Sequence, residues 1–246
     1  MSLESLVIGL LVLLAGFIDS IAGGGGLITL PAVSVLVGEG VAAVATNKIL
    51  AVTSASTALI VYWLHGHVRL KRSLIFVSSV GVASIVGAKA GHYLTPEIFR
   101  WLVAIVFPAM LILILKREAL TQEQSLNREV SVPLLIAIGI FCGFYDGCFG
   151  PGGGTLMFLS LAVVARMPML EALASSKLAN TLSAVGSLTT YAIAGHVVWE
   201  KGLWLGGVII VGSLVGSRLA SKKTQAVIKP VLVLVVALLI IKIVFL

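Results

Sequence analysis

The chain contains two copies of one motif about half its length apart: Gly16-Phe17-Ile18-Asp19 followed by Gly23-Gly24-Gly25-Gly26, and Gly143-Phe144-Tyr145-Asp146 followed by Gly150-Pro151-Gly152-Gly153-Gly154. Each copy lies inside a long apolar stretch. Each places one carboxylate just before a run of residues that cannot hold a helix. A duplicated helix break beside a charge is typical of the binding site of a membrane transporter.

The composition excludes an ordinary soluble domain. The chain has 246 residues, of which 59% are hydrophobic and 11% are charged, whereas soluble domains carry roughly 25% charged residues. The apolar excess runs along the whole length, so we expect an all-α, polytopic membrane protein with the lipid bilayer as its surroundings.

The net charge of +7 comes from basic residues gathered at the ends of apolar segments, which is typical of cytoplasmic membrane loops. A nucleic-acid partner is not expected, because no continuous basic face is present. The spacing of Cys142 and Cys148 fits no zinc or redox site, and we expect neither a metal nor another cofactor.

The duplication extends beyond the glycines. At an offset of 129 positions, residues 48–91 match the second half at about a dozen places. The matches include Lys48 with Lys177, Ser54 with Ser183, Tyr62 with Tyr191, and Gly66-His67-Val68 with Gly195-His196-Val197. We therefore predict two transmembrane repeats, 1–115 and 132–246, joined by the hydrophilic linker 116–131.

Segment lengths predict how each repeat crosses the membrane. Segments 27–38 and 154–165 correspond to roughly 18 Å of helix, which is too short for a hydrocarbon core of about 30 Å. We expect each to fold back on the segment before it, 5–22 or 132–149, as a re-entrant hairpin broken at the glycines.

The remaining segments predict three full transmembrane helices in each repeat: 42–64, 73–94 and 99–115, then 170–194, 202–220 and 226–246. Placing the basic loop at Arg69, the linker and Lys222-Lys223 in the cytoplasm makes the two repeats inverted, with both termini outside.

Lys48 and Lys177 are the strongest candidates for substrate binding. Each lies about two turns, or roughly 10 Å, inside an apolar helix, and an intramembrane lysine costs a few kcal/mol. A snorkelling lysine is the structural alternative. Because ammonium, amide and hydroxyl groups suit an oxyanion, we expect anion binding by the two lysines with Asn47, Ser176 and Asn180.

The glycine breaks offer a second set of donors. Free backbone N–H groups at a helix break form an anion-binding nest, and close helix packing is the alternative use of glycine in membranes. We expect the nest at Gly24, Gly25, Gly26, Gly152, Gly153 and Gly154.

Two further pairs of titratable residues recur in the repeats. Asp19 and Asp146 could pair with a lysine, shape the hairpin or carry a coupling proton. Because an ionised aspartate repels an anion, we expect a supporting place for both, behind the substrate. We interpret His67 and His196 as helix-end caps in preference to proton relays.

The motifs resemble a known family. Residues 16–31 followed by Thr46-Asn47-Lys48 resemble the N-terminal half of the TauE/SafE sulfite exporter family, and residues 143–152 with Lys177 and Gly195-His196-Val197 resemble its second half. The resemblance implies a multi-pass permease of the prokaryotic inner membrane for sulfite, organosulfonates and other sulfur-containing anions. Ser175-Ser176-Lys177 departs from Thr46-Asn47-Lys48, so we expect an asymmetric site.

The resulting hypothesis is a secondary-active anion transporter, not an enzyme, in which two inverted halves rock around a midplane site. One alternative is a permease subunit driven by an ATPase. The ATPase would be a separate protein, because this chain contains no Walker motif. Another is an intramembrane aspartyl protease, which would need a Gly-x-Gly-Asp motif that the chain lacks. The sequence leaves open the direction of transport, a coupling proton or sodium ion, and a homodimer.

Overall fold

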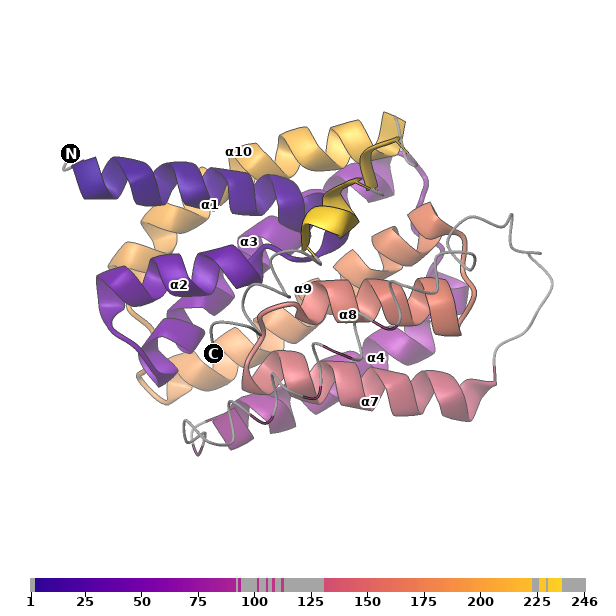
Figure 1. The fold of residues 1–246 in the computed structure, drawn as a ribbon. Helices are drawn as coiled ribbons and strands as arrows, with labels where there is room; N and C mark the ends of the chain where they lie inside the picture. Colours follow the sequence, from indigo (N-terminus) through magenta and orange to yellow (C-terminus); the bar gives the residue numbers. More distant parts are fainter. Residues whose placement is uncertain are drawn as a thin grey trace.

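The computed structural model describes residues 3–91, 93, 131–222, 226–228 and 230–235, together with Trp101, Ile105, Pro108 and Ile112. The described elements are helices, arranged as a bundle of long, roughly aligned rods (Figure 1). In chain order they are α1 (Leu3–Ala22), α2 (Gly26–Val37), α3 (Val41–Leu64), α4 (Leu70–Gly91), α7 (Val132–Cys148), α8 (Gly153–Leu159), the π-helical turn η1 (Ser160–Val164), α9 (Met169–Ile193) and α10 (Trp199–Lys222).

The glycine motifs end one helix and begin another, as predicted. Gly23, with φ 82°, stops α1, and α2 starts at Gly26 and runs back beside α1. In the second copy Gly150 and Gly152 have φ of 100° and 78°, and α8 returns beside α7. Glycine adopts these positive angles without the steric cost that a Cβ imposes.

The two hairpins enter the bundle from opposite ends, so α1 and α7 run in opposite directions (Figure 1). Their tips meet in the interior, where the Thr155 hydroxyl donates a 2.9 Å hydrogen bond to the carbonyl of Ala22. The repeated Gly-His-Val caps two other helices. Gly66 and Gly195, with φ of 73° and 75°, let the chain turn away after α3 and α9 as left-handed C-caps.

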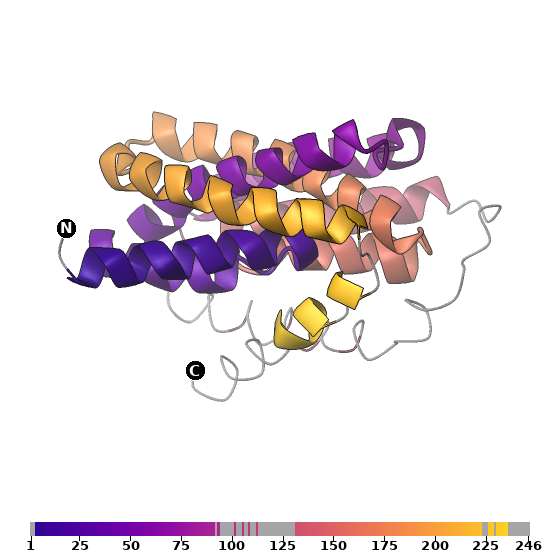
Figure 2. The ribbon, with the colours of Figure 1, turned by 90° about the horizontal axis from the view of Figure 1, so that it is seen from above.

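The two most extensive helix contacts each join a helix of one repeat to a helix of the other. α1 lies along α10, and α4 lies along α7; Figure 2 shows α10 running beside α1. Glycines make this contact close, because a methyl group added at Gly143 would lie 2.7 Å from Val80 Cα. One added at Gly16 would lie 2.7 Å from Ile209 Cγ1. Small residues allow such backbone approach between membrane helices.

The bundle therefore divides into two equivalent four-helix bodies. The first body contains α1, α2, α3 and α10, and the second contains α7, α8 with η1, α9 and α4. The central contact between the bodies is made by α3 against α9. Neither body coincides with one repeat of the sequence, because α4 and α10 have changed places.

The described helices have the length and surface of membrane spans. Four of them contain apolar stretches long enough to cross a bilayer: Ser5–Ala22, Val41–Leu64, Ser73–Gly91 and Trp199–Lys222. Many large apolar side chains face outwards, including Leu10, Leu14 and Val82. A polytopic helical membrane protein is thus confirmed. The predicted spans 99–115 and 226–246 and the linker lie largely outside the described residues.

Candidate functional site

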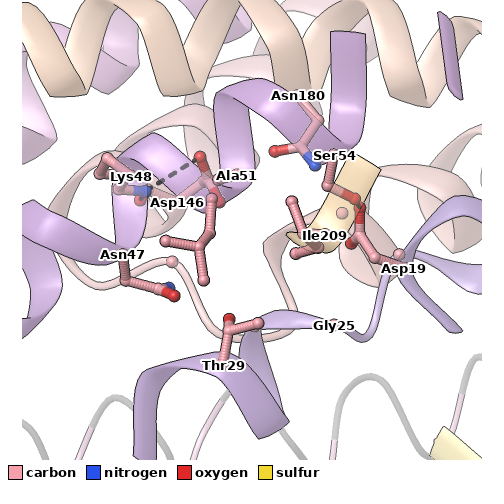
Figure 3. Close-up of a pocket in the computed structure, with 15 residues that line it drawn as sticks. Asp19, Gly25, Thr29, Asn47, Lys48, Ala51, Ser54, Asp146, Asn180 and Ile209 are labelled. Atoms are coloured by element: carbon pink, nitrogen blue, oxygen red, sulfur yellow. Dashed lines mark hydrogen bonds and ion pairs between the residues drawn. The ribbon is translucent and has the colours of Figure 1, made fainter. Parts of the chain in front are cut away.

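A small polar cavity lies where the two hairpin tips meet (Figure 3). Its volume is about 30 Å³, which is room for roughly two water molecules. It is lined by residues from both bodies: Asp19, Gly23, Gly25, Gly26, Thr29, Asn47, Lys48, Leu50, Ala51, Ser54, Asp146, Gly150, Gly154, Asn180 and Ile209. A cavity with this lining is a candidate site for a small, charged ligand.

Two buried ion pairs join the bodies across this region. Lys48 Nζ on α3 lies 3.3 Å from Asp146 Oδ2 on α7. Lys177 Nζ on α9 lies 3.1 Å from Asp19 Oδ2 on α1. All four side chains are buried. Each lysine thus pairs with the aspartate of the other repeat, and the two pairs occupy equivalent positions.

Hydroxyl groups within each body hold the aspartates in place. Ser54 Oγ donates to Asp19 Oδ2, and Ser183 Oγ donates to Asp146 Oδ2, both at 2.6 Å. Short bonds to an ionised carboxylate are stronger than neutral hydrogen bonds. The Tyr62 hydroxyl also donates to the carbonyl of Ser20 at 2.7 Å, which ties α3 to the end of α1.

Helix ends set the local electrostatics. Lys177 and Lys48 also donate to the backbone carbonyls of Asp19 and Asp146, at the negative C-terminal ends of α1 and α7. The positive N-terminal end of α2 faces the cavity through Gly25 and Gly26. The lysines therefore neutralise the negative groups, and the α2 end stays open to an anion.

Two amide side chains complete the polar lining. Asn47 is 5% exposed, and its Oδ1 has no hydrogen-bond partner among the described residues. In Figure 3 this amide points into the cavity beside Thr29, and Asn180 lies on the opposite side. A buried amide without a protein partner is costly, and a ligand in the cavity would satisfy it.

The structure brings together only part of the predicted anion site. Six of the predicted residues line the cavity: Lys48, Asn47, Asn180, Gly25, Gly26 and Gly154. Lys177 lies behind the lining, paired with Asp19. Ser176 also lies outside it and donates to the carbonyl of Leu173 at 2.8 Å.

The other predicted glycines serve packing and turn geometry. A methyl group added at Gly24 would lie 2.6 Å from Val235 Cγ2, and one added at Gly153 would lie 2.9 Å from Asp146 Cβ. Gly152 takes the left-handed conformation that starts α8. These three glycines do not line the cavity.

The aspartates lie nearer the cavity than the sequence suggested. Asp19 and Asp146 line the cavity itself instead of standing behind it. Each carboxylate contacts a lysine and accepts a hydrogen bond from a serine hydroxyl. These contacts offset the repulsion between an aspartate and a bound anion. Figure 3 shows the two aspartates on opposite sides of the cavity. An aspartyl protease would instead require two carboxylates that share a proton.

The histidines lie in the turns after α3 and α9, outside the cavity lining. The backbone N–H of His67 donates to the Tyr62 carbonyl at 3.0 Å, and that of His196 donates to the Tyr191 carbonyl at 3.1 Å. Partial burial lowers the pKa of His67, and the nearby His65 lowers it further.

The sequence reasoning missed several cavity residues. Thr29, Ser54 and Ile209 line the cavity, and Ser183 holds Asp146. The match between Ser54 and Ser183 in the repeat was a signal that could have found both serines. Nothing comparable marks Thr29 or Ile209, which reach the cavity only through tertiary packing.

Similarity to known proteins shows which family the chain belongs to. The family model described as "Sulfite exporter TauE/SafE" matches residues 8–243. The chain belongs to the TauE/SafE family. It is similar to the probable membrane transporter protein YfcA of Escherichia coli K12, with 33% identity over 92% of this chain and 84% of that protein.

Two further relatives match over a similar share of the chain. The probable membrane transporter protein ORF9 of a Sinorhizobium species is 32% identical over 90% of this chain and 85% of its own. A probable membrane transporter protein of Haemophilus influenzae is 29% identical over 89% of this chain and 86% of its own. No solved structure matches the chain. The family and these names indicate a membrane transporter, a class that is usually not enzymatic.

Proposed function

We propose that this TauE/SafE protein is a secondary-active permease of the prokaryotic inner membrane for small sulfur-containing oxyanions such as sulfite or organosulfonates. The observation that carries the proposal is the cavity, lined by buried charged and amide side chains, between two hairpin tips that arrive from opposite ends of the bundle. Discontinuous helices that meet at a midplane site are the arrangement used by many carriers with inverted repeats.

The substrate class follows from the donors and from the family. Lys48, the open end of α2 and the amides of Asn47 and Asn180 are groups that hold an oxyanion. The matched family model is described as a sulfite exporter. A sulfur oxyanion is larger than the cavity in this conformation, so its binding requires the bodies or side chains to move.

Alternating access uses the two four-helix bodies as the moving units. Within each body, glycine contacts and serine bonds are close, as between Gly143 and Val80 or Ser54 and Asp19. Between the bodies, the Lys48–Asp146 ion pair beside the cavity can break and re-form. In this proposal the repeats are inverted in the membrane, so the outward- and inward-facing states are related by a pseudo-two-fold axis and use the same contacts.

The positions of the basic residues support one orientation of the bundle in the membrane. The start of α4, the start of α7 and the end of α10 lie at one end of the bundle in Figure 1. Arg69 and Lys222 belong to this end, and Arg69 is exposed. Positive residues favour the cytoplasmic side, so this end faces the cytoplasm and the N-terminal end of α1 faces outwards.

The test is flux of radiolabelled sulfite and methanesulfonate in proteoliposomes, with the Lys48→Ala and Lys177→Ala variants beside wild type. Wild type moves at least one of these anions, and both variants lose most of that flux. Normal flux in both variants would overturn the site. Absence of any anion flux from wild type would overturn the function, and flux that appears only with an added ATPase and ATP would assign the chain to an ATP-driven system.

A further inference from the structure

The charges around the cavity balance to zero. Among the described residues, the buried charged side chains are Asp19, Lys48, Asp146, Lys177 and Glu171. The first four form the two crossed pairs, and Glu171 pairs with the exposed Arg69 at 3.7 Å, away from the cavity lining. No buried cation is therefore left over, within the described part of the chain, for an incoming anion.

An anion that enters this neutral site adds an uncompensated negative charge in a medium of low dielectric. Such a charge is costly unless it is paired. The positive end of α2 supplies only about half an elementary charge. The anion must therefore bring a cation with it or displace a negative group from a lysine.

The two ion pairs differ in how free they are to exchange partners. Lys48 and Asp146 both line the cavity, whereas Lys177 does not. Ser54, which donates a hydrogen bond to Asp19, has a second partner, because its Oγ lies 2.9 Å from Ser213 Oγ. Ser84, the equivalent of Ser213 in the other body, donates to its own helix at the Gly81 carbonyl instead.

Asp146 contacts one cation, Lys48. Asp19, the other carboxylate that lines the cavity, lies on its opposite side and is paired with Lys177. α3 presents Lys48, α9 presents the hydroxyls of Ser183 and Tyr191, and α4 and α8 present backbone and glycine. The remaining titratable groups nearby belong to α7 itself: Cys142, Tyr145 and Cys148.

We propose that the anion is transported together with one proton, that Asp146 carries this proton, and that Lys48 exchanges its Asp146 partner for the anion. This inference rests on the proposed function and deepens it. The proton binds Asp146 from the side on which the anion arrives. Lys48 Nζ then leaves Asp146 Oδ2 and pairs with an oxygen of the anion, while Ser183 still bonds the protonated carboxyl group. On the other side the anion leaves, Lys48 returns to Asp146, and the proton is released. Lys177 and Asp19 stay paired throughout as a clamp between the bodies.

A sulfonate is the best probe, because it stays ionised and does not carry a proton through the lipid by itself. Proteoliposomes with a pH-sensitive dye inside receive a methanesulfonate gradient, with potassium and valinomycin to set the membrane potential. We expect wild type to acidify the lumen by one proton per anion, and the flux to be insensitive to the membrane potential, because the transported pair is neutral. If sulfite moves and methanesulfonate does not, the same measurement is made with sulfite after subtraction of the rate in protein-free liposomes.

The Asp146→Asn variant separates the anion from its proton. Its anion flux should continue without acidification and should now respond several-fold to the membrane potential, because the anion moves alone. The matched Asp19→Asn variant should keep the ratio of one proton per anion, whatever its total rate. Equal loss of coupling in both variants would overturn the assignment to Asp146.

The wild-type measurement does not depend on either variant folding. Anion flux without acidification, or flux driven by a sodium gradient at equal pH, would overturn the proton coupling and leave the proposed function standing. Absence of flux for every anion tested would instead overturn the proposed function and this inference with it.

Discussion

The Lys48–Asp146 and Lys177–Asp19 pairs occupy equivalent positions but have different surroundings. Lys48 and Asp146 both line the cavity, and their closest charged atoms are 3.3 Å apart. Lys177 lies behind the lining, 3.1 Å from Asp19. The Asp19 side also has the additional Ser54–Ser213 link at 2.9 Å.

The difference shows how a duplicated fold can divide one set of contacts into two roles. Both pairs hold the two bodies together, but only the Lys48–Asp146 pair lines the cavity with both of its side chains. Substitutions can test both the equivalence of the two bodies and the difference between the two pairs.

The largest effect is expected where the equivalent glycines pack against backbone. Gly143→Leu and Gly16→Leu should each prevent folding, because an added methyl group already lies 2.7 Å from Val80 Cα or Ile209 Cγ1 and overpacking of this kind costs at least about 1–3 kcal/mol. Size-exclusion chromatography in detergent should show no monodisperse protein. Gly207→Leu is the control, because nothing lies within 4 Å of a Cβ at that position. Folding of one of the two leucine variants and not the other would contradict the equivalence of the bodies.

The next effect concerns the buried pairs. Lys48→Ala and Lys177→Ala should each lower the free energy of unfolding by about 3–5 kcal/mol, because each leaves a buried aspartate without its cation. Adding Asp146→Ala to the first variant and Asp19→Ala to the second should recover most of the loss. Denaturant titration in detergent measures this, and double variants that are less stable than the singles would show that the lysines do not compensate these aspartates.

The serines refine the comparison. Ser183→Ala should cost about 1.5–3 kcal/mol, the value of a hydrogen bond to a charged group. Ser54→Ala should cost roughly 1 kcal/mol more, because Ser54 also contacts Ser213. Thermal unfolding of the two variants side by side tests the order. A larger effect at Ser183 would mean that the Asp146 side is the more tightly held of the two.

The amides separate binding from stability. Asn47→Ala should raise the KM for the transported anion about 10-fold, equivalent to 1.4 kcal/mol, with little change in thermal stability, because Asn47 Oδ1 has no protein partner to lose among the described residues. Ser176→Ala, at the matching position of the other repeat, should leave the KM within about two-fold, because Ser176 lies outside the cavity lining and a bond not made to the ligand contributes nothing to its affinity. Equal KM changes in the two variants would show that both positions contact the substrate.

The smallest effect is expected at the turn after α3. The pKa of His67 is lowered in the folded protein, so the unfolded chain binds its proton more readily. The stability contributed by this group is therefore complete above the ordinary histidine pKa and decreases as the pH falls through that value. His67→Gln should make the melting temperature slightly less sensitive to acid, measured from pH 5 to pH 8, with His196→Gln as the comparison. A steeper acid dependence in His67→Gln would contradict the direction of the shift.

Much of the local structure could be predicted from the sequence. Runs of glycine stop helices for reasons that lie within the backbone, and the predicted break in 5–38 is found between α1 and α2. Helix ends also carry local signals, as at Ser131, whose hydroxyl accepts the N–H of Leu134 and caps α7. The sequence repeat made Lys48 and Lys177 equivalent residues, and in the structure their ion pairs occupy equivalent positions.

The tertiary partners could not be predicted in the same way. A repeat shows that Asp19 and Asp146 are equivalent, but it does not show which lysine each aspartate meets. That choice depends on how α3 and α9 pack beside the two hairpin tips, which are contacts between segments far apart in the chain. For the same reason the sequence did not reveal that Lys177 would be screened from the cavity while Lys48 lines it.

The exchanged packing also has a consequence for biosynthesis. Ser213 on α10 donates to the carbonyl of Gly16 on α1 across 197 positions of the chain. At the usual rate of translation, α1 waits about 10–40 s for this partner to be made. For most of that interval, until α9 has been made, Asp19 lies in a membrane helix without Lys177 to neutralise it. The first helix to be synthesised thus gains its most extensive contact only near the end of synthesis, and a chain that stops before α10 would present this uncovered face to chaperones and membrane proteases.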